Sequence, residues 1–223
     1  MQTELKISEI FYSLQGESTF AGLPCIFIRL SDCNLRCNYC DAAYTWKEKG
    51  ELLSVSDILA TLNNFPCNLV EVTGGEPLFQ EECIPLLSSL INVGKTVLLE
   101  SNGSFPINTV PAAVTCILDV KCPDSGSGNS FTLKNIQEIL NRSISRPGSC
   151  ELKFVLSSKN DYQWAKEFIF THKLTGVLPI LFSPVQDRIE PQRIAEWIME
   201  DGLNVRLQLQ LHTILWPEIS RGV

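Results

Sequence analysis

The chain has 223 residues, of which 44% are hydrophobic and 19% are charged, so its composition excludes a disordered, fibrous or low-complexity protein. A chain of this length can bury roughly 70% of the surface that its unfolded form exposes. Because 18 basic residues stand against 25 acidic ones, the net charge is −7. We therefore expect a small molecule as the partner, with no nucleic acid and no membrane surface.

Two further features of the composition indicate the compartment and the chemistry. The apolar runs reach only about six residues, far below the roughly 18 to 20 that span a bilayer. The N-terminal segment has no signal-peptide pattern, so we place the chain in the cytoplasm. Disulfides do not persist there, and the nine cysteines therefore predict metal binding or redox chemistry for some of them.

In chain order, apolar and mostly β-branched runs predict strands over 25–30, 69–73, 96–100, 114–120, 152–156 and 177–182, with a partly alternating seventh over 204–211. Helices are predicted between them over 58–65, 85–93, 133–140, 162–170 and 191–199. This alternation indicates parallel βα units, too few for an eight-unit barrel. We therefore expect an α/β fold in a single domain, 1–223, built as an open, partial (β/α) barrel of about six parallel strands.

The segments that directly follow the predicted strands should carry the chemistry, because ligands bind at the carboxyl ends of strands in parallel α/β sheets. These segments are 31–46, 74–77, 101–104, 121–129 and 183–186.

Cys33, Cys37 and Cys40 lie in the first of these segments with the spacing C-x3-C-x2-C. Zinc usually takes four ligands, often from paired cysteine or histidine motifs, and neither His172 nor His212 has a histidine neighbour at such a spacing. Three thiolates can instead hold three irons of a 4Fe–4S cluster and leave the fourth iron open. The spacing therefore predicts a catalytic cluster, and the six other cysteines are expected to pack as small hydrophobic residues.

The cysteine spacing, with Tyr39 before the last cysteine and Gly74-Gly75-Glu76 after the next strand, resembles the radical S-adenosylmethionine (SAM) superfamily. The resemblance implies the radical SAM type of partial barrel, in which SAM chelates the open iron and is cleaved to a 5′-deoxyadenosyl radical. The SAM-binding residues that it implies are Tyr39, Gly74, Gly75, Glu76, Ser101, Asn102, Asp119, Lys121 and Ser183.

Two end segments are more specific than the cysteine spacing. Residues 9–18 and 207–217, together with Arg221-Gly222-Val223, resemble the 7-carboxy-7-deazaguanine synthase family. That resemblance implies a lyase that converts 6-carboxy-5,6,7,8-tetrahydropterin to 7-carboxy-7-deazaguanine with loss of ammonia, on the way to queuosine. The substrate-binding residues that it implies are Leu14, Gln15, Gly16, Glu17, Arg29, Thr73, His212 and Val223.

The chemistry of these residues suits a pterin. Its edge alternates donors and acceptors, which main-chain groups of 14–16 can match, while Glu17 can accept from ring amino groups and Arg29 can hold the carboxylate. The resemblance implies that the radical abstracts hydrogen from C6, that the ring then contracts, and that SAM is regenerated. No protein group is expected as a catalytic nucleophile. The implied partners are an external one-electron reductant such as flavodoxin and, for the assembly, a homodimer.

Position 42 departs from the family. Many members have a threonine there whose hydroxyl helps to bind Mg²⁺, whereas this chain has Ala42, and a methyl group cannot ligate a hard cation. Asp41 and Thr45 are the nearby oxygen donors that could substitute. The simpler hypothesis is that Mg²⁺ dependence is weak or absent.

Two other functions remain open at this stage. A glycyl-radical-enzyme activase would share the cysteine and glycine motifs but would not explain 14–17 or the segment around His212. A non-catalytic iron–sulfur redox sensor would have no use for Gly74-Gly75-Glu76. Detection of 5′-deoxyadenosine separates the sensor from both enzymes, and turnover of the carboxytetrahydropterin separates the synthase from the activase.

Overall fold

The computed structural model describes residues 4–219 and 221–223. A nine-stranded sheet runs through them in the order β3-β1-β2-β4-β5-β6-β7-β8-β9. The strands are β1 (Glu4–Leu14), β2 (Pro24–Leu30), β3 (Glu51–Ser54), β4 (Leu69–Gly74), β5 (Thr96–Ser101), β6 (Thr115–Asp119), β7 (Cys150–Leu156), β8 (Ile180–Pro184) and β9 (Arg206–Leu207). From β2 to β9 all neighbours are parallel, whereas β1 is antiparallel to both β2 and β3.

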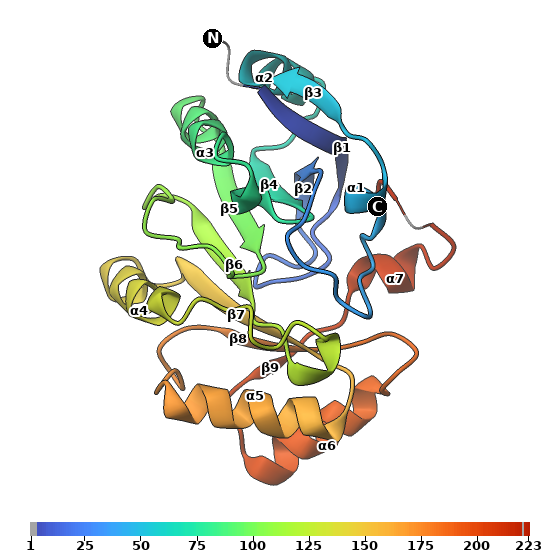
Figure 1. Cartoon of the computed structure of the whole chain (residues 1–223), viewed down its shortest axis with the longest axis vertical. Helices are drawn as coiled ribbons and strands as arrows, with labels where there is room; N and C mark the ends of the chain where they lie inside the picture. Colours follow the sequence, from blue (N-terminus) through green and yellow to red (C-terminus); the bar gives the residue numbers. More distant parts are fainter. Residues whose placement is uncertain (1–3, 220) are drawn as a thin grey trace.

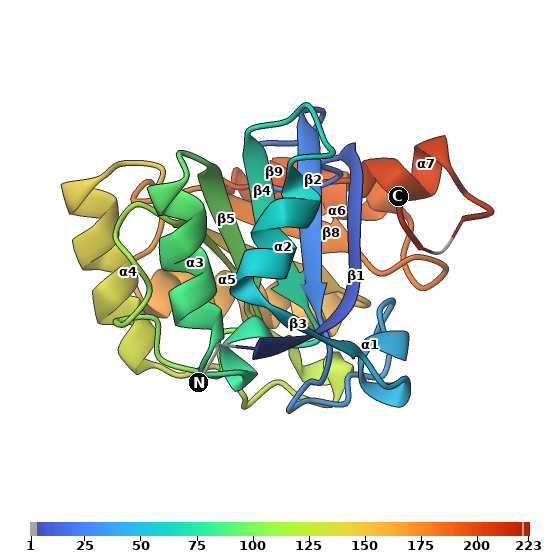
Figure 2. The same ribbon diagram turned by 90° about the horizontal axis from the view of Figure 1, so that it is seen from above.

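The sheet is curved, and its long helices cover one face while the N-terminal loops and the C-terminal segment meet on the other (Figures 1 and 2). The outer helices are α2 (Val55–Leu62), α3 (Cys83–Asn92), α4 (Lys134–Ser145), α5 (Lys159–Thr171) and α6 (Pro191–Asp201). Two short helices, α1 (Tyr44–Lys47) and α7 (Leu211–Leu215), lie on the inner side with the C-terminus, and single 3-10 turns occupy 77–79 and 123–125. No helix in the described ranges has the length and apolar character needed to cross a membrane.

Side chains alternate between the two faces of the sheet because successive residues of a strand point to opposite sides. In β7, Leu152, Phe154 and Leu156 belong to the hydrophobic core, which lies between the sheet and the outer helices. The residues between them, Lys153 and Val155, line the cavity on the inner face. The same strands therefore build the core and the floor of a site.

The sequence predictions are confirmed for six strands, β2 and β4 to β8, and for all five outer helices. The alternating run over 204–211 is a strand only in part, since Arg206–Leu207 form β9 beside β8 and Leu211 already begins α7. After Leu207 the chain turns inward, and the buried amide of Gln208 donates to the carbonyl of Ser18 (3.2 Å). Strands β1 and β3 were missed, because the polar residues that interrupt them hide the alternation.

Candidate active site

A cavity of about 670 Å³ opens at the carboxyl ends of the parallel strands, within the usual range of small-molecule sites, roughly 300 to 1,000 Å³. The three clustered cysteines and all eight predicted substrate residues line it. Seven of the nine predicted SAM residues line it as well. Glu76 and Ser183 are buried behind the lining instead. Motifs from the N-terminal and C-terminal parts of the sequence thus line the same cavity.

The cysteine loop follows β2 and is fastened to its neighbours by backbone hydrogen bonds. Asp32 N–H donates to the Thr45 carbonyl (2.9 Å), and the Cys40 N–H donates to the Cys37 carbonyl (3.3 Å). Cys33, Cys37 and Cys40 are free thiols, of which Cys40 is exposed and the other two are half-buried. Burial raises the pKa of Cys33 and of Cys40. Within the described residues, no three His, Cys, Asp or Glu side chains are gathered closely enough to hold a single metal ion.

The loop fits a 4Fe–4S cluster. Three free thiols from one segment line one cavity, and no fourth cysteine is among the described residues of its lining. A cluster with one open iron requires this arrangement. Lys121 also lines this space, and its cation lowers the pKa of Cys40 against the larger effect of burial. A neighbouring cation favours the thiolate forms that bind iron.

Gly75 allows the loop and the end of β4 to approach closely. A Cβ atom at Gly75 would lie 2.1 Å from the Asp32 carbonyl oxygen and 2.8 Å from Cys33 Cβ. The Gly75 N–H donates to the Leu30 carbonyl (3.1 Å), and the next N–H, of Glu76, donates to the Asp32 carbonyl (3.0 Å). The glycine pair therefore sets the position of Cys33.

Glu76 is fully buried, and its carboxylate accepts three hydrogen bonds from the protein. Leu78 N–H (3.0 Å) and Ser101 Oγ (2.8 Å) donate to Oε1, and Asn102 N–H donates to Oε2 (2.7 Å). Burial raises the pKa of Glu76 to about 7, with these hydrogen bonds opposing the shift. The side chain thus fixes the end of β5, and its contact with SAM stays a prediction, as does that of Ser183.

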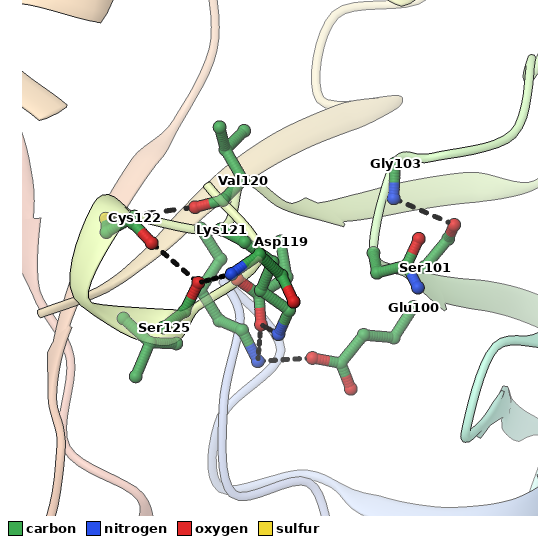
Figure 3. A network of polar contacts seen from close by, with 12 residues as sticks. Glu100, Ser101, Gly103, Asp119, Val120, Lys121, Cys122 and Ser125 are labelled. Carbon is green, nitrogen blue, oxygen red and sulfur yellow. Dashed lines mark hydrogen bonds and ion pairs between the residues drawn. The ribbon is translucent and has the colours of Figure 1, made fainter. Parts of the chain in front are cut away.

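A buried lysine, Lys153 on β7, joins the carboxylates at the cavity floor. Its Nζ lies 2.7 Å from Glu17 Oε2 and 3.8 Å from Asp119 Oδ2, and it also forms an ion pair with Glu100. Asp119 Oδ2 accepts a second cation, Lys121 Nζ, at 2.7 Å. Figure 3 shows Glu100 at the end of β5 pointing toward the Asp119 and Lys121 side chains at the end of β6.

Lys153 and Glu100 stabilise each other's charged forms in spite of burial. Although burial opposes the shift, the carboxylates of Glu100 and Glu17 raise the pKa of Lys153 well above its ordinary value. Burial likewise opposes the effect of Lys153 on Glu100, yet the pKa of Glu100 is lowered. The predicted SAM residue Asp119 and the predicted substrate residue Glu17 are therefore joined through one cation.

Arg29 lies at the other side of the cavity, at the end of β2. Its Nε donates to Glu9 Oε1 (2.8 Å), and the same oxygen accepts from the Tyr44 hydroxyl (2.6 Å). The guanidinium carbon lies 5.7 Å from the centre of the Phe11 ring. These contacts use one edge of the guanidinium, so its two terminal nitrogens remain for a ligand.

The C-terminal segment closes the site against the loop after β1. The Leu211 N–H donates to the Gly16 carbonyl (3.1 Å), and Gln210 Nε2 donates to Glu17 Oε1 (2.8 Å). A Cβ atom at Gly16 would lie 2.8 Å from His212 Nδ1, so any larger residue there would require the His212 side chain to shift. Both end motifs are therefore parts of one wall of the cavity.

Several lining residues were missed from the sequence: Glu9, Tyr44, Glu71 and Lys153. A charged residue within an apolar strand, such as Glu71 or Lys153, is the signal that could have found them, because an unpaired charge is rarely buried without a function or a partner. Of the oxygen donors near Ala42, Asp41 lines the cavity, whereas the Thr45 hydroxyl donates to the Ala42 carbonyl (2.8 Å).

Comparisons with known proteins agree with this geometry. Residues 28–113 match the Radical SAM superfamily model. A 7-carboxy-7-deazaguanine synthase from Chlorobaculum tepidum is 44% identical over 225 residues, covering 100% of both chains. Another, from Koribacter versatilis, is 42% identical over 234 residues and covers 98% of this chain and 100% of its own. In fold, the chain is similar to the crystal structure of QueE from Escherichia coli, with a TM-score of 0.74 at 23% identity over 93% of this chain and 94% of that chain.

Proposed function

Because the chain belongs to the 7-carboxy-7-deazaguanine synthase family of radical SAM lyases, we propose that its cavity converts 6-carboxy-5,6,7,8-tetrahydropterin to 7-carboxy-7-deazaguanine with release of ammonia. One observation carries the proposal beyond the superfamily. The two end segments typical of this family line the same cavity as the three cysteines, and they are hydrogen-bonded to each other there.

In this proposal Cys33, Cys37 and Cys40 hold a 4Fe–4S cluster, and residues at the ends of β4, β5 and β6 hold SAM. When bound, the cluster and SAM together supply a one-electron route to hydrogen abstraction from carbon. The Glu76 carboxylate accepts from the Ser101 hydroxyl and from the Asn102 N–H, which holds the end of β5 in place. Positioning of this kind is the protein's main contribution to the rate.

Residues from the loop after β1, from β2 and β4, and from the C-terminal segment are proposed to hold the pterin. Arg29 presents its terminal nitrogens to the substrate carboxylate while Glu9 and Tyr44 fix the rest of its side chain. Glu17, held by Lys153 and Gln210, faces the ring amino groups. Thr73, whose hydroxyl donates to Glu100 (3.3 Å), and His212 border the same space.

The proposal includes weak Mg²⁺ dependence. Ala42 lines the cavity without an oxygen donor, and the Thr45 hydroxyl is engaged by the Ala42 carbonyl. Asp41 is then the side-chain oxygen donor nearest to position 42 on the lining. The proposal also includes a flavodoxin-like one-electron reductant, action in the cytoplasm, a homodimer and a single domain over the whole chain.

Anaerobic turnover tests this function directly. The reconstituted protein, given SAM, a reductant and the carboxytetrahydropterin, should form 7-carboxy-7-deazaguanine and ammonia. Cys37→Ala should lose the cluster and all turnover, because it removes one of three ligands, whereas Cys67→Ala, a half-buried cysteine away from the cavity, should keep both. Formation of 5′-deoxyadenosine without pterin turnover would support the activase instead, and a cluster without SAM cleavage would support the sensor.

A further inference from the structure

Glu71 is a buried carboxyl group that the proposed chemistry has not used. It lies in the middle of β4, two residues before Thr73, with 3% of its surface exposed, and it lines the cavity. Within the described residues no cation is within 4.0 Å of its oxygens, although Lys153 is within that distance of Glu17, Glu100 and Asp119. A buried carboxylate without a cation is costly, so the group is favoured in its neutral form.

The hydrogen bonds around Glu71 determine which atom carries its proton. The Glu17 N–H donates to Gln15 Oε1 (3.0 Å), and this fixes the orientation of the Gln15 amide. The amide nitrogen of Gln15 then donates to Glu71 Oε2 at 2.5 Å. Because Oε2 accepts this bond, the proton of a neutral Glu71 is placed on Oε1. The described part of the chain provides no acceptor for that O–H group.

We propose that Glu71 is a specificity-determining residue that acts as a neutral carboxylic acid: it clamps Gln15 through one oxygen and donates its O–H to an acceptor on the substrate ring. This inference rests on the proposed function and adds a requirement to it. The ring must present a carbonyl oxygen or an unprotonated nitrogen toward the floor of the cavity. A carboxylate at this position would repel such an atom, so the acid discriminates by its protonation state.

The electrostatic surroundings support the neutral form. Charged or titratable groups face Glu71 from the loop after β1 (Glu17), from β5 (Glu100), from β7 (Lys153) and from β2 (Cys25). Burial is the main cause that raises the pKa of Glu71 well above its ordinary value, the carboxylates of Glu100 and Glu17 add to it, and Lys153 opposes it. Lys153 forms ion pairs with Glu17 and Glu100 and none with Glu71 among the described residues. Of these three carboxyl groups, Glu71 is therefore the one that we expect to stay protonated.

Two variants separate the neutral acid from other roles. Glu71→Gln keeps an acceptor for Gln15 and a donor toward the cavity, so its KM for the pterin should stay within about threefold of the native protein. Glu71→Met keeps the length but removes both groups, so its KM for the pterin should rise tenfold or more. Binding to the native protein should weaken as the pH rises through the raised pKa of Glu71, and Glu71→Gln should remove that dependence.

Infrared difference spectroscopy tests the inference without turnover. The native protein minus Glu71→Gln should show the C=O stretching band of a protonated carboxyl group at neutral pH. Absence of that band overturns the inference, as do an equal loss of binding in both variants or no loss in Glu71→Met. If the native protein does not turn over the pterin but shows the band, the proposed function fails while the neutral acid stands, so the two failures are distinguishable.

Discussion

At the scale of the single residue, the cavity contains more carboxylates than cations, and each cation has a defined place. Lys153 serves three carboxylates, Lys121 serves Asp119, and Arg29 serves Glu9. The Arg29 ion pair uses Nε alone, so the terminal nitrogens of Arg29 can face an anionic ligand. Arg29 is therefore the partner that we expect for the substrate carboxylate.

Arg29→Ala is expected to weaken pterin binding far more than SAM binding. Loss of a charge-assisted contact to a partly buried carboxylate costs about 2 to 5 kcal/mol. Arg29→Lys should recover only part of this, because a lysine cannot make the two-pronged contact. Titration of each ligand into the reconstituted protein measures both affinities, and equal losses for SAM and pterin would remove Arg29 from the substrate site.

Replacing Ala42 by threonine tests whether the missing hydroxyl explains weak Mg²⁺ dependence. If weak Mg²⁺ dependence results from the missing hydroxyl, Ala42→Thr should make turnover after chelation respond to added Mg²⁺, because a hydroxyl supplies the hard oxygen donor that a methyl group lacks. Turnover with and without Mg²⁺ in the two proteins decides this. Strong stimulation of the native protein at low Mg²⁺ would contradict the hypothesis and direct attention to Asp41.

Residue chemistry was also the part of the site that the sequence predicted best. The cysteines and the two end motifs are contiguous patterns, and all of them line the cavity. Lys153 and Glu71 were missed because their roles depend on neighbours in other strands: Glu100 meets Lys153 across 53 positions and Gln15 meets Glu71 across 56. No local pattern records such a pairing.

At the scale of the element, the site depends on how closely the end of β4 meets the cysteine loop. Parallel pairing places Leu30 of β2 beside Gly74, and the backbone of the next glycine then passes against Asp32. The predicted strands were reliable here because buried parallel strands are continuous apolar runs. The antiparallel β1 was missed because buried and exposed side chains alternate only over its first four residues. The rest of the strand is half-buried or exposed.

Gly75→Ala should displace Cys33 and reduce cluster content. The added Cβ would meet backbone, the Asp32 carbonyl oxygen at 2.1 Å, and backbone cannot move aside as the end of a side chain can. The matched control is Gly94→Ala, where the added atom meets nothing within 4 Å and the cost is the left-handed backbone alone, about 1 kcal/mol. Iron and sulfide analysis after reconstitution compares them, and a full cluster in Gly75→Ala would show that the glycine does not set the loop.

At the scale of the whole molecule, one sheet carries strands from both ends of the chain (Figure 1). Residues from the loop after β1 and from the C-terminal segment line the same cavity. The sequence predicted the parallel part of this architecture from alternating strands and helices. It did not predict that 209–211 would leave the sheet. The side chains of Gln208 and Gln210 turn to the loop after β1, and Leu209 between them is exposed.

The contacts between the loop after β1 and the C-terminal segment also have a consequence for biosynthesis. Gln208 and Gln210 reach partners 190 and 193 positions earlier in the chain, so these bonds cannot form until the segment around Gln210 has left the ribosome. The hairpin of β1 and β2 can pair early, and the parallel strands can add to it in turn as they emerge. The wall of the cavity that holds Gly16 and Glu17 is therefore completed last.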